Sequence, residues 1–141
     1  MELAIKFYYW HEVMGPLLTY TKGKFEITDE DLLILLSSVE PYNITIESTI
    51  SGPSYLGKKV IMTYNRCVNN PDAQDERICL LGADCWVLIA CPIELEIVLL
   101  SKIDLVKTIL DIEFDTIAEI NQIDAIMGER ADYAIRKIYL D

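Results

Sequence analysis

The run "CWVLIAC" at residues 85–91 constrains the fold of this chain more than any other segment. It has no polar break, and Pro92 follows it immediately. A strand that is apolar on both faces belongs at the centre of a sheet, because both of its faces must be covered. The run therefore predicts a central strand, and the rest of the chain must supply neighbouring strands and covering helices.

Shorter segments rich in β-forming residues precede this run. The bend "HEVMG", with Gly15-Pro16 at its end, separates the first two, which are therefore expected to form a hairpin. Residues 51–57 and 65–77 are predicted to be a turn-rich break and an exposed loop. The apolar residues 78–81 are predicted to be strand, with Gly82-Ala83-Asp84 as a tight turn or bulge. The predicted strand segments are "ELAIKFYYW", "PLLTYT", "YNITIESTI", "KKVIMTY" and "ICLL".

A helix is predicted at residues 28–38, "TDEDLLILLSS". Thr28 can cap its N-terminus, and the acidic residues that follow lie where the helix dipole favours negative charge. Leucine or isoleucine occupies every position from 32 to 36, which gives more than one apolar stripe. This pattern predicts a well-buried helix that ends before Pro41.

The chain after Pro92 is predicted to be helical. Apolar residues recur at helical spacing, which favours one long helix, although residues 94–100 alone also fit a strand, with Ser101 then capping a shorter helix. A final helix is expected from about residue 116 or 121 to residue 140, with Gly128 as a break or kink. The apolar residues of the long helix are Leu95, Leu99, Ile103, Val106 and Leu110.

These elements predict an α+β fold with the order β-β-α-β-β-β-α-α. Hairpins imply an antiparallel sheet of about five strands, and helices must cover its apolar faces. A length of 141 residues suits a single domain that spans residues 1–141.

The net charge and the lengths of the apolar stretches argue against some classes of function. The net charge of −11 argues against nucleic acid as a partner, because phosphate binding needs a basic patch. No apolar stretch reaches the roughly 18–20 residues that span a bilayer, and the start of the chain lacks a secretory pattern. A cytoplasmic protein without an integral membrane segment is therefore expected.

The cysteines do not predict a metal site. Their spacings contain no C-x-x-C, and a single histidine cannot complete a zinc set. Reduced thiols that behave as small buried hydrophobes are expected, and no metal or other cofactor is expected. The cysteines are Cys67, Cys79, Cys85 and Cys91.

Catalytic patterns are weak. His11-Glu12 begins like the zinc-protease motif, but Gly15 replaces its second histidine, so His11 is predicted to be a turn residue. The acidic helical residues are predicted to form solvated faces, and neither a nucleophile elbow nor a phosphate loop is present. No catalytic or cofactor-binding residue is therefore predicted, and Trp10 and Trp86 are expected in the core or sheet. The acidic residues are Asp111, Glu113, Asp115 and Glu119.

The segment "CWVLIACPIELEIVLLSKIDLVKTILDIEF" resembles longin-type domains, particularly the small subunits of vesicle-coat adaptor complexes. The bend and strand "VMGPLLTY" look like the opening hairpin of longin and roadblock proteins, and residues 119–141 look like the last longin helix. The loop at residues 65–76 and the "RICLL" segment add length between the fourth and fifth longin strands. The residues in similar roles are Glu94, Leu95, Ile103, Val106, Leu110 and Phe114.

This resemblance implies a non-enzymatic protein-interaction module, a scaffold or adaptor for small GTPases or trafficking-type partners. A homodimer, or a pair with a related longin or roadblock module, is expected. The apolar excess of residues 28–38 predicts the partner interface at Leu32, Leu33 and Leu36. The alternatives are a small-molecule-sensing domain of profilin or PAS type, and an enzyme whose carboxylates converge in a cleft.

Overall fold

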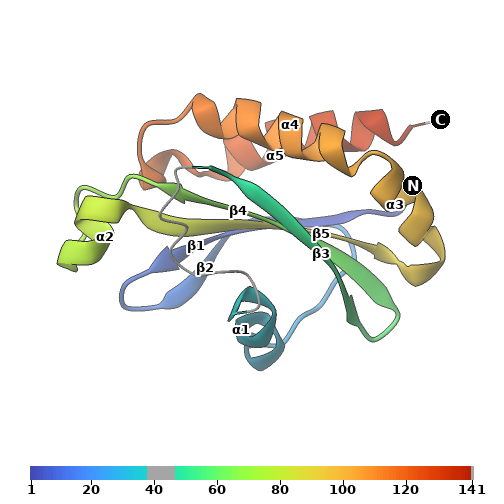
Figure 1. The fold of residues 1–141 in the computed structure, drawn as a ribbon, viewed down its shortest axis with the longest axis horizontal. Helices are drawn as coiled ribbons and strands as arrows, with labels where there is room; N and C mark the ends of the chain where they lie inside the picture. Colours follow the sequence, from blue (N-terminus) through green and yellow to red (C-terminus); the bar gives the residue numbers. More distant parts are fainter. Residues whose placement is uncertain (38–46, 141) are drawn as a thin grey trace.

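A computed structural model describes residues 1–37 and 47–140. Its centre is a five-stranded antiparallel sheet in the order β2-β1-β5-β4-β3 (Figure 1). The strands are β1 (Ala4–His11), β2 (Gly15–Lys22), β3 (Thr49–Leu56), β4 (Lys59–Val68) and β5 (Ala83–Pro92). The predicted α+β class with an antiparallel sheet is confirmed.

The predicted central strand is β5, which pairs with β1 on one side and β4 on the other. All residues from Cys85 to Cys91 are buried, as a strand covered on both faces requires. Its register with β4 is continuous from Lys59↔Pro92 to Val68↔Ala83. The sheet therefore has a rigid middle on which both helical layers pack.

Helices cover the two faces of the sheet unequally (Figure 1). The pair α4 (Ile103–Asp115) and α5 (Ala125–Ile138) lies on one face, and α1 (Asp29–Ser37) lies on the other. The core beneath α4 and α5 is the larger, and it contains stacked Phe7 and Phe114 rings. The smaller core beneath α1 is built around Trp86 and Leu88. Within residues 1–37 and 47–140, α1 covers only part of this face of the sheet.

The first helix forms as predicted, but it is less buried than predicted. The Thr28 hydroxyl accepts a hydrogen bond of 3.1 Å from the backbone N–H of Asp31, which caps α1. Only one stripe of α1 faces the sheet, so the outward-facing Leu33 and Ile34 are 50% and 63% exposed. Pro41, where the helix was predicted to end, lies outside the described residues.

The predicted strand at residues 78–81 is wrong, because these residues belong to helix α2 (Glu76–Leu81). The Asp75 side chain caps α2 by accepting from the N–H groups of Arg77 and Ile78. Gly82 ends it with a φ of 88°, a conformation that glycine adopts readily, and is neither a turn nor a bulge within β5. The predicted loop at residues 65–77 is also too long, because β4 extends to Val68.

The predicted break at residues 51–57 is wrong as well, because most of it lies within β3. The pairing of β3 with β4 shifts register between Ser51 and Ser54, on either side of Pro53. Proline lacks an N–H group and is tolerated on an edge strand such as β3. The first five residues of the predicted strand "YNITIESTI" lie outside the described residues.

The region after Pro92 is helical, which excludes a strand at residues 94–100. The predicted single long helix is nevertheless divided into η1 (Ile93–Leu95), α3 (Glu96–Ser101) and α4, with a non-helical Lys102 before α4. After a short turn, η2 (Ile120–Gln122), the last helix α5 begins at Ala125. Gly128 does not break α5. It lies inside the helix, where it permits close approach to Tyr20 of β2. Among the described residues, none of the helices has the length and apolar character that spanning a bilayer requires.

Candidate functional site

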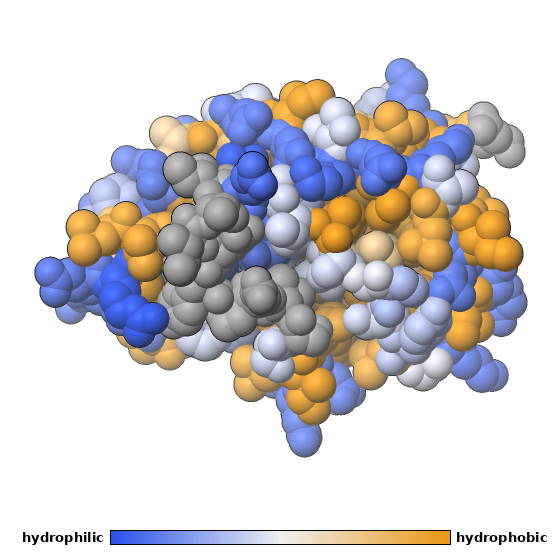
Figure 2. All heavy atoms as spheres, viewed as in Figure 1, coloured by the Kyte–Doolittle hydropathy of each residue, from blue (hydrophilic) through white to orange (hydrophobic). Residues whose placement is uncertain are grey.

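An open groove of about 1080 Å³ lies on the α1 face of the sheet, between α1 and α2. Its floor is formed by the end of β1, the start of β2, the end of β4 and the start of β5. Its walls are apolar side chains of the two helices, and Figure 2 shows apolar residues over α2 at the left and α1 at the bottom. The principal lining residues are Trp10, Cys67, Asp84 and Trp86 on the floor, and Leu33, Ile34, Ile78, Leu80 and Leu81 on the walls.

The groove walls carry leucine and isoleucine side chains that are unusually exposed for apolar residues. On α2, Leu80 and Leu81 are 76% and 58% exposed, and the facing residues of α1 are Leu33 and Ile34. Single exposed hydrophobic residues are ordinary on a protein surface, whereas a contiguous apolar patch marks an interaction site. The groove is therefore the candidate functional site.

Polar contacts hold α2 in position as a wall. The Glu12 carboxylate, at the tip of the β1–β2 hairpin, accepts hydrogen bonds of 2.9 and 3.1 Å from the backbone N–H of Gln74. At the start of the same loop, residues 69–75 between β4 and α2, the Asn69 carbonyl accepts a hydrogen bond of 2.9 Å from the backbone N–H of Ile120. The connection between β4 and β5 is thus fixed to the β1–β2 hairpin by Glu12 and to η2 by Ile120.

The groove floor offers little reactive chemistry. The Cys67 thiol donates to the Asp84 carboxylate across 3.5 Å. Burial, and then the nearby Asp84 charge, raise the pKa of Cys67 to about 12. A thiol that stays protonated at neutral pH is a poor nucleophile, because the thiolate is the reactive form. Cys67 and Asp84 are therefore polar contacts within an apolar site.

The predicted interface residues divide between the core and the groove. Leu32 and Leu36 are 5% and 6% exposed and pack beneath α1, although Leu36 also borders the groove. Leu33, one turn of helix before Leu36, faces the groove and is half exposed. Of the three leucines, Leu33 offers the most surface to a partner.

His11 ends β1 and is the turn histidine that its sequence context predicts. Its Nδ1 atom accepts hydrogen bonds of 3.1 Å from the backbone N–H groups of both Val13 and Met14. The ring thus organises the bend of the first hairpin. Within residues 1–37 and 47–140, no three His, Cys, Asp or Glu side chains are grouped so that they could hold a metal ion.

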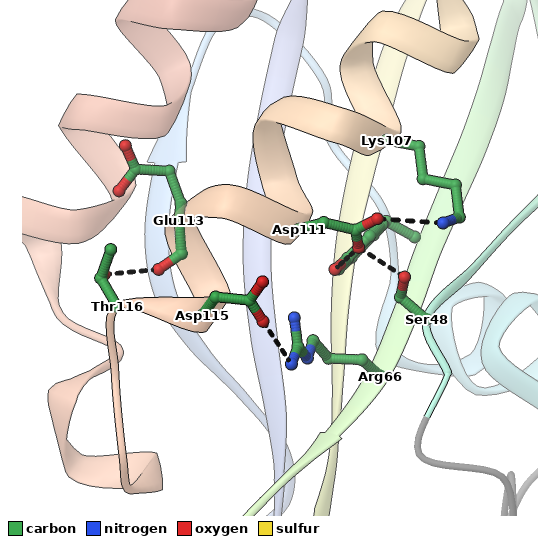
Figure 3. A network of polar contacts seen from close by, with 8 residues as sticks. Ser48, Arg66, Lys107, Asp111, Glu113, Asp115 and Thr116 are labelled. Carbon is green, nitrogen blue, oxygen red and sulfur yellow. Dashed lines mark hydrogen bonds and ion pairs between the residues drawn. The ribbon is translucent and has the colours of Figure 1, made fainter.

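The acidic residues of α4 are not simply a solvated face, as was predicted, but form a polar network on the opposite side of the sheet (Figure 3). Asp111 accepts hydrogen bonds from Tyr64 at 2.6 Å, from Lys107 at 3.0 Å and from Ser48. Burial alone would raise the pKa of Asp111, but these hydrogen bonds outweigh it and lower the pKa. Asp111 is therefore an ionised anchor between α4 and the sheet.

The neighbouring carboxylates have separate partners. Asp115 pairs with Arg66 at 3.1 Å, and Glu113 pairs with Arg130 at 2.6 Å. The Arg66 guanidinium also lies 5.6 Å from the centre of the Phe114 ring. These pairs join α4 to β4 and α5, and none of their members lines the groove between α1 and α2. The arrangement explains helix packing rather than a converging acid–base pair.

Searches against protein-family models, curated proteins and solved structures find no match to this chain. The candidate site therefore rests on geometry alone.

Sequence reasoning missed the α2 wall of the groove. The short apolar run "ICLL" is compatible with strand or helix, and its β-like composition favoured strand. The available signal was the pair of helix-end residues, Asp75 as N-cap and Gly82 after the last turn.

Proposed function

We propose that this chain is a non-enzymatic protein-interaction module of longin type, which binds a partner protein in the groove between α1 and α2. The observation that carries this proposal is the gathering of exposed apolar side chains around one groove, from two helices and a hairpin. An adaptor or scaffold role toward small GTPases or trafficking-type proteins is the function that the longin resemblance implies.

The order of elements supports the longin assignment. Two strands, one helix, three strands and a helical C-terminal region follow one another as in the resemblance, with α2 added between β4 and β5. The residues that carried the resemblance on α4 are Ile103, Val106, Leu110 and Phe114. The last three are buried against the sheet, and Ile103 is partly buried. The addition of α2 is the departure from the longin order, and it supplies one wall of the proposed binding site.

The test compares two matched double variants. Ile34→Ser/Leu81→Ser removes apolar surface from both groove walls. Ile112→Ser/Ile126→Ser removes it from α4 and α5, where Ile112 and Ile126 are 60% and 70% exposed. Immobilised wild type and both variants are incubated with lysate of the source cell, and captured proteins are quantified by mass spectrometry.

We expect a set of proteins that the wild type and the α4/α5 variant retain and the groove variant loses. Circular dichroism establishes that each variant is folded. Equal capture by all three proteins would contradict a binding role for the groove.

The groove also supports a second candidate, a small-molecule-sensing domain. Its volume of about 1080 Å³ is slightly above the usual range for ligand pockets, and Cys67 and Asp84 provide polar contacts on its floor. Walls with exposed leucine and isoleucine side chains suit a protein segment better than a small ligand, which is normally enclosed. Native mass spectrometry of the purified protein distinguishes the two, since a stoichiometric adduct of low mass would favour sensing.

A further inference from the structure

We infer that the occupant of the groove is a basic amphipathic helix of another protein, with an apolar stripe flanked by lysine or arginine, rather than a second copy of this chain. This inference rests on the proposed function and adds the chemistry of the partner. It follows from the backbone of the groove floor, the charges around the groove and the charges of α1.

The groove floor favours a helix over an extended strand. The floor residues Cys67 and Asp84 lie opposite one another in the β4–β5 ladder, and β4 and β5 are both interior strands of the sheet. Their backbone groups are thus engaged in the sheet and offer no free edge for an added strand. Pro16 of the edge strand β2 also lines the groove, but proline has no N–H group to donate to an added strand. A helix pairs its own backbone N–H and C=O groups, and it can bury side chains spaced i, i+3 and i+4 in an apolar groove.

The charges around the groove favour a basic partner. Asp75 and Asp84 line it, and the exposed Glu76 lies in the first turn of α2. On α1, the exposed Glu30 precedes Ile34 by four residues and therefore shares its side of the helix. Arg77 is the basic residue among the lining residues described. Cationic side chains beside an apolar stripe would therefore meet carboxylates on both walls.

The same charges disfavour a second copy. Each chain carries a net charge of −11, so two copies repel one another before they make contact. The first turn of α1 holds Asp29, Glu30 and Asp31, and its last turn holds no basic residue. Neither a parallel nor an antiparallel pair of α1 helices brings a cation of one helix against these carboxylates.

The probe is a fluorescein-labelled peptide of leucine and lysine, about 18 residues long, with leucine at helical i, i+3, i+4 and i+7 positions. A second peptide has glutamate in place of every lysine. Fluorescence anisotropy measures the affinity of each for the full chain. At about 50 mM salt we expect the lysine peptide to bind at least about tenfold more tightly, and at about 500 mM salt the difference falls below about threefold.

Matched charge reversals separate the effect of charges beside the groove from the effect of the net charge of the chain. Glu30→Lys/Glu76→Lys changes carboxylates beside the groove, on the two wall helices. Asp104→Lys/Glu129→Lys makes the same change in net charge on α4 and α5, where both residues are exposed. We expect the first pair to weaken binding of the lysine peptide by about tenfold and the second by less than about threefold. Equal weakening by the two pairs would overturn the inference, because the attraction would then be a property of the whole charged surface.

The apolar variants distinguish failure of this inference from failure of the proposed function. If the two peptides bind equally well and Ile34→Ser/Leu81→Ser weakens both, the groove is a docking site but its partner is not selected by charge. If that variant weakens neither peptide while the protein stays folded, groove docking itself fails.

Light scattering over a concentration series tests the second copy as occupant. We expect a monomer up to high micromolar concentration. A dimer that Ile34→Ser/Leu81→Ser dissociates, and that Ile112→Ser/Ile126→Ser leaves intact, would overturn the inference and assign the groove to self-association.

Discussion

The Tyr64 hydroxyl of β4 donates a hydrogen bond of 2.6 Å to the Asp111 carboxylate of α4. Burial, and then this bond, raise the pKa of Tyr64, so the phenol remains a donor at neutral pH. The same carboxylate accepts from Lys107 and Ser48 (Figure 3). One acidic side chain thus joins the helical layer to a central strand and to the residue just before β3.

Replacement of Asp111 tests this anchor. Asp111→Ala should lower the free energy of unfolding by about 2 kcal/mol, because several charge-assisted hydrogen bonds are lost and the Tyr64 hydroxyl is left without its acceptor. Urea denaturation followed by circular dichroism measures the change. Asp104→Ala, at an exposed position in the first turn of α4, is the control and should cost less than about 1 kcal/mol, because it loses only a favourable interaction with the helix dipole. Similar losses for both variants would show that the network does not stabilise the fold.

The Asp111 pKa also predicts the pH dependence of stability. The pKa of this carboxyl is lower in the folded chain than its ordinary value of about 3.9. Its stabilising contribution is therefore complete above about pH 4 and is lost as the pH falls through the lower folded pKa. Asp111→Asn should show a shallower loss of stability than wild type between about pH 5 and pH 2, measured by urea unfolding at each pH. Parallel curves would exclude Asp111 as a source of the acid sensitivity.

Gly128 provides a test in which two effects have opposite signs. Glycine inside a helix ordinarily costs about 1 kcal/mol relative to alanine, so Gly128→Ala would be expected to stabilise α5. A Cβ atom at this position, however, would lie 2.4 Å from Cγ of the buried Tyr20 ring. We expect the steric conflict to dominate and the variant to lose about 1–3 kcal/mol.

Thermal or urea unfolding measures the effect of Gly128→Ala. In a Tyr20→Leu background, where the ring is absent, the loss should shrink or reverse. A stabilised Gly128→Ala single variant would show that α5 can move away from β2 at little cost.

The four cysteines are unbridged in the structure but differ in environment. Cys79 on α2 is exposed, Cys67 is half-buried, and Cys85 and Cys91 are buried. Burial also raises the pKa of Cys91 to about 11. Thiol titration of the native protein should show one fast-reacting group, and titration after denaturation without reductant should give four. If Cys79→Ser leaves the fast reaction unchanged, the reactive thiol lies elsewhere.

The core of the sheet was predictable from sequence because it depends on strong local patterns. Residues 85–91 are too apolar for any position except the sheet centre, and the hairpin around His11 combines β-forming residues with a clear bend. The Thr28 cap was likewise visible, since a capping side chain acts within its own first turn. Such features are decided by residues that are close in the chain.

Other features depend on contacts between distant residues, and these were not predictable. β3 retains its strand through Pro53 because it lies at a sheet edge, and the number of exposed residues on α1 depends on how much sheet lies beneath it. Gly128 looked like a helix break because its reason for being small is the Tyr20 ring, more than one hundred residues earlier. The groove likewise brings together α1, α2 and strand ends that are distant in the chain, so sequence reasoning named Leu33 as a candidate but not the opposite wall.

Val68 and Ala83 lie directly opposite one another at the end of the β4–β5 ladder. Two antiparallel strands that meet in this way can be joined by a turn of about two residues. The sheet itself thus does not require the whole of residues 69–82, the segment that carries α2. One wall of the candidate groove is therefore carried by a connection that the sheet does not require. Shortening this one connection would remove that wall while leaving the strand register in place, so the shape of the proposed binding site can diverge among related sequences without remodelling the fold.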